Sequence, residues 1–473
     1  FTATVAPVAP GAGTPTGTVT FTFGDGTATA PAPLVNGVAT LTHTYGTRSG
    51  SPFTVTAAYN GSPDHAPSTG TDTQTVNQGA TTTTVATTPD PSVVGQPVTF
   101  TATVAPVAPG AGTPTGTVTF TFGDGTATAP APLVNGVATL THTYGTRSGS
   151  PFTVTAAYNG SPDHAPSTGT DIQILNRATT TTALTSSPNP CVVGQPVTLI
   201  ATVAPAAPAT GTPTGTVTFT WGDGTASASA PLVNGVATLT HTYATRSGSP
   251  LTVTAAYGGD TSYTTSSGTG TQTVNQATTT TTVTSTPDPS GIGQQVAVTA
   301  AVAAATPASG TPTGTVKFSF GNGTAPVTAA LANGVATATT TYSGTTGSPF
   351  SITAAYGGDT GYAPSTGTDT QTVSGAATTT AVTTSPNPSR PGNKITTTAT
   401  VAVVPPATGT PTGYVTLALA DRETQVLPLK DGIATTTFTS VNPGTYPVTA
   451  TYSGTGTFAP STGTTTQIVN QPS

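Results

Sequence analysis

The tripeptide Pro-Thr-Gly recurs along the chain at a constant interval of 99 residues. Its copies begin at Pro15, Pro114, Pro213, Pro312 and Pro411. An Asn-Gly pair and a later tyrosine keep the same interval through the first four copies, and residues 1–72 are identical to residues 100–171. Solenoid repeats have periods of about 20–50 residues, whereas a period near 100 is the size of an independent β-sandwich domain. The repeat therefore predicts a string of similar domains.

The period divides the 473 residues into five units. The predicted domains are 1–78, 79–177, 178–276, 277–375 and 376–473, named domains 1 to 5 below. Domain 1 is expected to be incomplete. Phe1 aligns with Phe100, and no part of domain 1 corresponds to residues 79–99, where we expect the first strand and half of the second. Such a domain would have an open groove that a strand from another chain could fill, but the favoured interpretation is that an N-terminal segment is missing and that the sequence is a fragment of a longer array.

Domain 5 is the most divergent unit. Its charged residues sum to +1, whereas domains 1 to 4 carry −2, −2, −1 and −2. Terminal repeats often have atypical, more polar surfaces. We therefore expect domain 5 to be a cap or a contact module.

Within domain 2, Val98–Val104 and Thr117–Phe122 alternate with the period of two that a half-buried strand requires. Asn135-Gly136 is a strong hairpin signal. The other predicted strands are Thr81–Ala86, a proline-broken segment before Asn135, Val137–Tyr144, Phe152–Tyr158 and Thr170–Leu175. The predicted core is Val98, Phe100, Val118, Phe120, Val137, Leu140 and Val154. About seven strands without helical periodicity predict an all-β chain of antiparallel sandwiches.

The linkers between units are short. The last strand of one unit reaches the first strand of the next through two or three residues, such as Asn176-Arg177-Ala178, and no Gly/Ser tether intervenes. Such linkers predict a semi-rigid rod.

The composition excludes several classes of protein. Only 5% of residues are charged, against about 25% in ordinary soluble proteins. Nine Lys and Arg residues cannot form a basic groove for nucleic acid, and no apolar run is long enough to span a membrane. The 45 Pro and 55 Gly residues make disorder the main rival, but the net charge of only −6 and the regular alternation favour a folded chain. The near absence of Lys, which usually guards sheet edges, predicts self-association or binding to other surface proteins.

The string ATTTTALTSSPNPCVVGQPVTLIATVAP from Ala178, followed by GTPTGTVTFTWGDGT and LVNGVATLTHTY, resembles bacterial Ig-like domain repeats. The Phe-Gly-Asp-Gly turn and the His-Thr-Tyr segment of domains 1 to 3 are also similar to PKD domains. Domain 4 has Gly321-Asn322-Gly323 instead, and domain 5 has Ala420-Asp421-Arg422-Glu423. The resemblance implies secreted or surface-anchored bacterial proteins that act as stalks, adhesins or filament subunits, and it does not imply an enzyme.

Few residues favour catalysis or a cofactor. The chain has a single Glu, Glu423, so paired catalytic carboxylates are not expected. His43, His142 and His241 are predicted to be strand-face residues, and His65 and His164 to lie in surface loops. Calcium is the best cofactor candidate, with Asp25, Asp124 and Asp223 as its candidate ligands. Each turn supplies only one carboxylate, whereas calcium takes six to eight oxygens, so ordinary turn residues are the favoured reading. Cys191 is a lone cysteine, which leaves no disulfide within the chain.

The sequence thus predicts a non-enzymatic, extracellular structural protein with no catalytic, cofactor-binding or metal residues beyond those calcium candidates. It would form a semi-rigid stalk or a subunit of a fibre or surface layer. Three alternatives stay open: an adhesin or glycan-binding protein, a phage virion appendage, and an accessory region of an enzyme.

Overall fold

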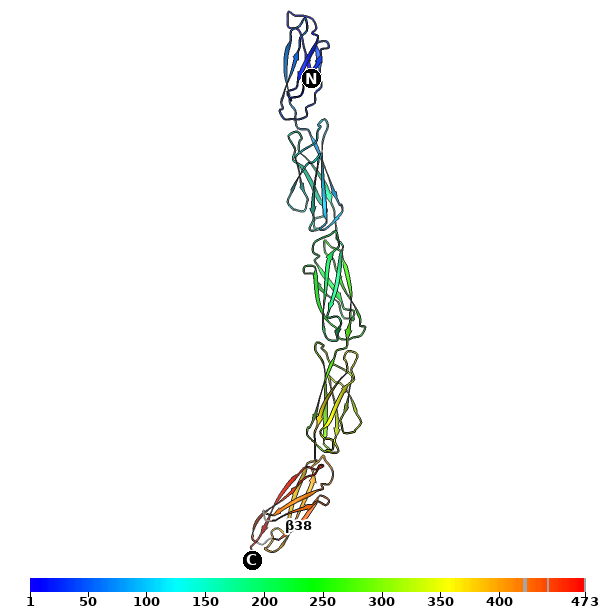
Figure 1. Ribbon diagram of the computed structural model, residues 1–473, viewed down its shortest axis with the longest axis vertical. Coiled ribbons are helices and arrows are strands. Elements are labelled where there is room, and N and C mark those ends of the chain that lie inside the picture. The colour runs from blue at the N-terminus through cyan, green and yellow to red at the C-terminus, as the bar shows by residue number, and fades with distance from the viewer. Residues whose placement is uncertain (420–422, 440–441, 472–473) are drawn as a thin grey trace.

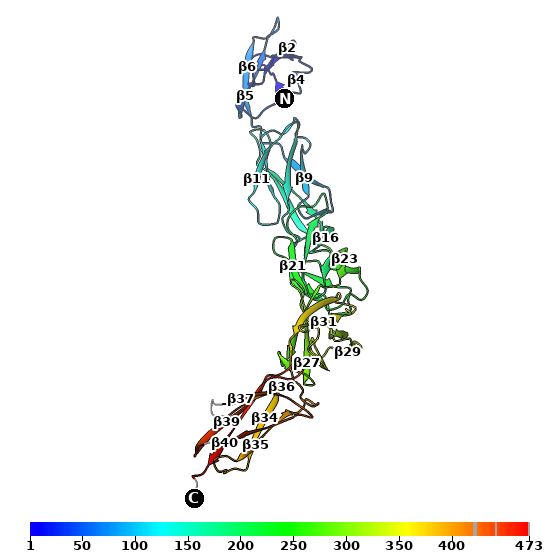
Figure 2. The ribbon, with the colours of Figure 1, turned by 60° about the horizontal axis from the view of Figure 1, so that its bottom comes forward.

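The computed structural model describes residues 1–419, 423–439 and 442–471. These residues form strands, turns and loops, and none of them lies in a helix. Five β domains follow one another end to end, with the chain termini at opposite ends of a gently curved rod (Figure 1). A second view shows the same succession without any fold-back of the chain (Figure 2). The predicted all-β class with tandem sandwiches is confirmed.

Domain 2 shows the complete pattern of strands. Its strands are β7 (Thr81–Thr88), β8 (Ser92–Val93), β9 (Pro97–Pro106), β10 (Thr117–Thr121), β11 (Ala129–Pro132), β12 (Val137–Thr143), β13 (Phe152–Tyr158), β14 (Ser167–Gln173) and β15 (Leu175–Asn176). The order β12-β9-β7 makes a three-stranded antiparallel sheet, and β11-β10-β13-β14 makes a four-stranded one. The short strands β15 and β8 pair in parallel and tie the end of the domain to its beginning.

Domains 3 and 4 repeat this pattern. Domain 5 has an isolated parallel bridge, Ser389 with Val469, in place of the short strand pair, and no described residue of domain 1 forms a counterpart of β7 or β8. Domain 1 has β1 (Thr2–Thr4), β2 (Thr18–Thr22), β3 (Ala30–Pro33), β4 (Val38–Thr40), β5 (Phe53–Tyr59) and β6 (Ser68–Gln74). Domain 3 has β16 (Thr180–Ser187), β17 (Cys191–Val192), β18 (Pro196–Pro205), β19 (Thr216–Thr220), β20 (Ala228–Pro231), β21 (Val236–Thr242), β22 (Leu251–Tyr257), β23 (Ser266–Gln272) and β24 (Val274–Asn275). Domain 4 has β25 (Thr279–Thr286), β26 (Ser290–Gly291), β27 (Gln295–Ala304), β28 (Thr315–Ser319), β29 (Val327–Ala330), β30 (Val335–Thr341), β31 (Phe350–Tyr356), β32 (Ser365–Gln371) and β33 (Val373–Ser374). Domain 5 has β34 (Thr378–Ser385), β35 (Lys394–Val403), β36 (Tyr414–Leu419), β37 (Glu423–Pro428), β38 (Ile433–Thr439), β39 (Gly444–Tyr452) and β40 (Ser461–Val469).

The core of domain 2 lies between its two sheets. Five of the seven predicted core residues are fully buried: Val98, Phe100, Val118, Phe120 and Val154. Leu140 and Val137 are each only partly buried. Successive side chains of a strand point to opposite faces, so β12 cannot bury both an odd and an even position. The face with Ala138, Leu140 and His142 turns inward, and Ala138 is fully buried.

The predicted Asn-Gly hairpin is confirmed. Asn135 and Gly136 have φ angles of 53° and 77°, and Val134 pairs with Val137 across the turn. Positive φ at both central positions is the type I′ geometry, which Asn-Gly adopts most readily.

The first strand of each complete domain approaches a glycine in the last long strand. A Cβ atom added to Gly169 of β14 would lie 2.3 Å from the carbonyl oxygen of Thr83 in β7, and Gly268, Gly367 and Gly463 show the same closeness in domains 3 to 5. The equivalent Gly70 of domain 1 would meet no atom within 4 Å, because no described residue of domain 1 forms a counterpart of β7. Glycine at this position lets the two sheets close.

Gly169→Ala should therefore destabilise domain 2 by about 1–3 kcal/mol, the usual cost of overpacking. The matched change Gly270→Ala in β23, where an added Cβ would meet only Val253 at an ordinary 3.6 Å, should leave domain 3 nearly unaffected. Hydrogen exchange of the full chain tests both, with β7 amides as the readout for domain 2, because residues 79–99 have no identical copy in domain 1. Equal effects of the two substitutions would contradict this account.

Candidate functional site

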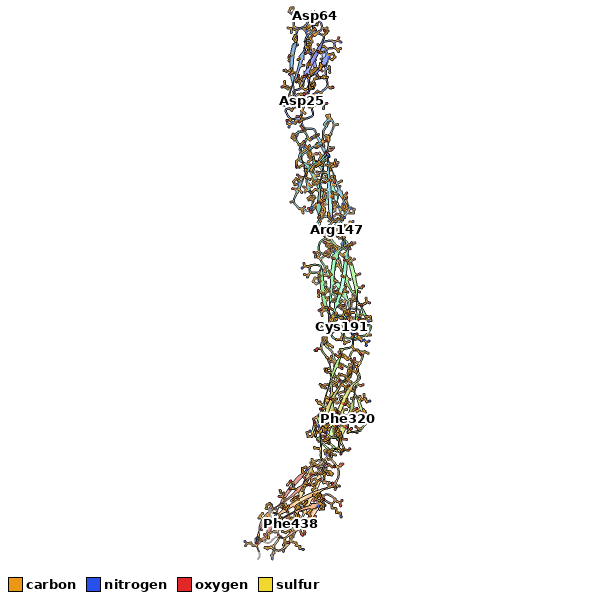
Figure 3. All side chains as sticks on the ribbon, in the orientation of Figure 1. Asp25, Asp64, Arg147, Cys191, Phe320 and Phe438 are labelled. Carbon is orange, nitrogen blue, oxygen red and sulfur yellow. The ribbon has the colours of Figure 1, made fainter. Side chains whose placement is uncertain are left out.

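An aspartate and a histidine meet in each of the first three domains. In domain 2, Asp124 lies in the glycine-flanked turn between β10 and β11, and His142 projects from β12. The carboxylate Oδ2 lies 2.7 Å from His142 Nε2, while Oδ1 accepts hydrogen bonds from the backbone N and the hydroxyl of Thr126. Asp25 with His43 and Asp223 with His241 repeat this geometry. Figure 3 places Asp25 at the end of domain 1 that faces domain 2.

Aromatic rings hold the histidine in place. The His142 ring stacks on Phe122 with a centroid distance of 4.0 Å, and Tyr144 contacts its other side edge-on. In domain 3, Trp221 replaces the phenylalanine and stacks on His241 at 4.4 Å. Trp221 is buried, and its indole N–H donates to the carbonyl of Ala226. It is therefore part of the core and is not a surface platform for a sugar ring.

The Asp–His pair and its hydrogen bonds fix the conformation of the turn that contains the aspartate. In a hydrolytic triad, the nucleophilic hydroxyl bonds to the histidine, which removes its proton. Here the nearby hydroxyl of Thr126 donates to the aspartate instead. Domain 4 keeps comparable bonds without a charged pair, because Asn322 accepts from Thr324 and donates to Thr340. Of the corresponding segment of domain 5, residues 420–422 lie outside the described residues.

These hydrogen bonds favour the ionised carboxylate. Hydrogen bonds from Thr27, together with His43, lower the pKa of Asp25 from 3.8 to about 2. At Asp223, burial alone would raise the pKa, but the bonds from Thr225 and His241 outweigh burial and hold it below 3.8. A carboxyl with a lowered folded-state pKa stabilises the fold above its ordinary pKa, and this stability is lost as the pH falls through the lower value.

The three calcium candidates lie in three different domains, so they cannot share one ion. Both oxygens of each carboxylate already accept hydrogen bonds from Thr and His side chains. Among the described residues, no group of three or more His, Cys, Asp and Glu side chains lies close enough together to hold a metal ion.

The remaining aspartates shape loops and junctions. Asp260 and Asp359 each accept bonds from a threonine of the loop that precedes β19 or β28 and from backbone N–H groups of their own loop. Asp90 and Asp288 accept the backbone N–H that follows β14 or β32. Asn189 and Asn387 do the same in domains 3 and 5. Because an amide replaces the carboxylate there, it is the hydrogen-bond geometry that matters at this position.

The prediction for His164 is wrong, whereas the lone Cys191 is a free thiol. His164 was expected in a surface loop, but it is buried, because the linker residue Gly79 pairs alongside it. Cys191 is a free, buried thiol at the position of Ser92. Burial raises the pKa of this thiol.

Each linker is paired with the loop before the last long strand of the following domain. Gly79 N donates to the carbonyl of Asp163, and Ala165 N donates back to the carbonyl of Gly79, both at 2.8 Å. Ala178 makes the same two bonds with Ser262 and Thr264. Ala277 and Ala376 repeat the pattern in domains 4 and 5. Only one residue, Arg177, separates β15 from the bonded Ala178.

The side chain of that single residue adds a further bond. Arg177 donates to the carbonyls of Asp260 and Tyr263. Gln78 and Gln276 each donate to a carbonyl of the next domain at 2.7 Å. The fourth linker has Gly375 at this place, which has no side chain to contribute.

Loops of neighbouring domains also bond directly, as at Arg147 between domains 2 and 3 (Figure 3). The backbone N–H of Arg147 donates to Ser262, and that of Arg48 donates to Asp163 at 2.6 Å. Thr210 and Ser309 donate to the carbonyls of Gly95 and Gly194 in the preceding domain. No motif in the sequence predicts these bonds. The one regularity in the sequence is that the two bonded residues always lie 115 positions apart.

Trp221 is the only tryptophan, so its fluorescence reports on the domain 3 pair alone. In urea unfolding, the stability of domain 3 should fall between pH 6 and pH 3, because the folded state favours the ionised Asp223. Asp223→Asn should show a smaller fall, since it keeps an acceptor for Thr225 without a titrating group. All other titrating groups are the same in the two proteins, so the difference between them reports on Asp223 alone. An equal loss of stability in both proteins would refute this role of Asp223.

Cys191 should react with a thiol reagent such as Ellman's reagent only when domain 3 unfolds, because the thiol is buried and its pKa is raised. We expect a labelling rate that follows unfolding in denaturant. A Ser92→Cys variant should behave in the same way in domain 2. Fast labelling of the native chain would show an accessible thiol.

Comparison with known proteins identifies the domains. A family model described as "Bacterial Ig-like domain (group 3)" matches residues 1–77, 83–175, 184–275, 282–374 and 382–470. No curated protein matches the chain. No helix of the described residues is both long and apolar enough to cross a membrane.

Solved structures with similar folds have low identity to the chain. The eight N-terminal Ig domains of the cell adhesion molecule DSCAM are 14% identical, with a TM-score of 0.23, and the match covers 96% of this chain and 56% of that eight-domain chain. FdeC, an Escherichia coli adhesin, is 15% identical, with a TM-score of 0.21 and coverages of 62% and 97%. Three domains of the outer capsid protein Hoc of bacteriophage RB49 are 15% identical, with a TM-score of 0.20 and coverages of 62% and 98%. No role follows from these values. The family model matches most of the chain, and the chain therefore belongs to the bacterial Ig-like domain family (group 3), whose domain it repeats five times.

Proposed function

We propose that the chain is a non-enzymatic, extracellular structural protein of bacterial origin, a semi-rigid stalk that holds whatever lies at its two ends apart. The observation that carries this proposal is the pairing of each linker with the next domain. In the last three linkers, a single residue lies between the last strand of one domain and the hydrogen-bonded first residue of the next, which leaves little rotational freedom between these domains. A freely jointed chain of the same domains would be shorter on average and would not keep its ends apart.

The polar contacts found at the aspartates and histidines support the same proposal. They join segments of one domain or neighbouring domains, and they use hydrogen bonds that persist where Asn replaces Asp. A stalk needs such contacts for its shape, and it does not need a pocket. The bacterial surface as its location is part of the proposal and is supported by membership of the family.

The stiffness can be tested by small-angle X-ray scattering of the full chain. A Gly-Ser-Gly-Ser insertion between Arg177 and Ala178 should shorten the mean end-to-end distance and broaden the distance distribution, because it separates Arg177 from its acceptors. The same insertion after Gly392, in the loop before β35 of domain 5, where an added side chain meets no atom within 4 Å, is the matched control and should leave the scattering unchanged. Indistinguishable scattering of wild type and junction variant would contradict the proposal.

Electron microscopy of the native material separates the proposed stalk from its alternatives. Rods standing on a cell envelope would support it, whereas rods on virions would indicate a phage appendage. Binding to a glycan array would indicate an adhesin.

A further inference from the structure

The outer edge of the four-stranded sheet differs between domain 2 and domain 4. In domain 2 this edge is β11, which pairs with β10, and in domain 4 it is β29, which pairs with β28. Pro130 and Pro132 of β11 stand at the places that Thr328 and Ala330 occupy in β29. Proline has no backbone N–H, so the two edges offer different hydrogen-bonding groups.

A hydrogen bond at the end of β29 shows which way its backbone groups point. The N–H of Leu331, the residue after β29, donates to the carbonyl of Gly314 on the side of β28 at 2.9 Å. The N–H and C=O groups of successive residues alternate between the two sides of an antiparallel strand. The N–H and C=O groups of Thr328 and Ala330 therefore point away from β28, and no strand of the described sheet lies beyond them.

Proline occupies these outward positions in the other domains. In domain 2 the N–H of Leu133 donates toward the start of β10 in the same way, so Pro130 and Pro132 hold both outward places. Domains 1, 3 and 5 have proline at one or both of them, as Pro31 and Pro33, Pro231 and Pro428. Proline at such positions protects a sheet edge from pairing with another chain. Among these described edge strands, β29 alone lacks it.

Charge does not protect the edge of domain 4 either. The sequence has no charged residue between Lys317 and Asp359, whereas domain 5 has Glu423 at the start of its edge strand. Val327, Thr328 and Ala330 of β29 are all exposed. A second copy of this edge would meet no like charge and only small or medium side chains.

We propose that β29 is a self-association site, at which the edge strands of two copies of the chain pair antiparallel about a two-fold axis. The axis passes beside Ala329, so that Thr328 of each copy lies opposite Ala330 of the other. Each of these two pairs exchanges two N–H···O=C bonds, which gives about four bonds in all. A second β29 is the occupant that fits, because the proline-bearing edge of domain 1 or 2 would supply acceptors without donors. This inference does not depend on the proposed stalk function.

The side chains and the shape of the rod are compatible with this pairing. Val327 is 39% exposed, and in this register it lies opposite Leu331 of the second copy, which would cover it. The same surface patch serves both copies, as a closed two-fold interface requires. The strands of domain 4 run roughly along the rod (Figure 1), so the pairing places two rods side by side in opposite directions.

Sedimentation velocity of the full chain over a range of concentrations tests the association. The wild-type chain should form a dimer. The double variant Thr328→Pro with Ala330→Pro copies the edge of domain 2 and removes the outward N–H groups, so its dimer dissociation constant should rise about tenfold or more, by the loss of hydrogen bonds. The matched variant Thr328→Ser with Ala330→Ser keeps both N–H groups and should dimerise like the wild type. Hydrogen exchange of β28 confirms that domain 4 of each variant is folded.

Disulfide trapping tests the register without any proline. Ala329 would lie opposite itself across the axis, with Cα atoms about 4.5 Å apart, which is within the range that a disulfide spans. Ala329→Cys should therefore give a disulfide-linked dimer with oxidised glutathione. Thr366→Cys, exposed on β32 at the other edge of the sheet, should not, and the buried Cys191 is common to both proteins.

Three results would each overturn the proposal. A wild-type chain that sediments as a monomer at every concentration would do so in favour of another occupant, such as an extended segment of a different protein. Unchanged dimerisation of the folded double proline variant would place the association elsewhere on the chain. Equal cross-linking of Ala329→Cys and Thr366→Cys would exclude the two-fold register.

Discussion

The rod depends on four residues at the domain boundaries, each of which is held by two backbone hydrogen bonds. Gly79, Ala178, Ala277 and Ala376 each donate to and accept from the loop before the last long strand of the following domain. Immediately before each of the last three, a short parallel pair such as β15 with β8 fixes the chain to its own domain. The linker is thus bonded on both sides, and the direction of each domain is set by its neighbour. The shape in Figure 1 follows from this repeated bonding.

The chain makes its contacts with few charges. Its contacts are mainly hydrogen bonds that involve Thr and Ser hydroxyls, backbone amides and single carboxylates, and few of them are ion pairs. The replacement of Asp90 by Asn189 and of Asp124 by Asn322 in other copies preserves the main hydrogen bonds. A surface ion pair contributes little to stability in water, so a repeat built on neutral hydrogen bonds loses little by having 5% charged residues.

Closure of each sandwich depends on a glycine. Gly169 and its counterparts have no side chain, so the backbone of the first strand can lie directly against the backbone of the last long strand. The serine and the aspartate of the last long strand then bond to threonines of the first strand, as Ser167 does to Thr83 and Asp171 to Thr87.

The 99-residue period, the alternation of Val, Phe and Thr, and the Asn-Gly pairs were sufficient to predict five all-β sandwiches, most of the core and the hairpin turns. These features act over a few neighbouring residues, where sequence spacing translates directly into geometry. The inward face of β12, the burial of His164 and the bonding of Asp25 to His43 could not be predicted in this way. They depend on residues that meet across two sheets or across a domain junction, at separations of 18 to 115 positions. Only the folded rod brings these residues together, because packing between sheets and between domains decides which of several polar partners each side chain reaches.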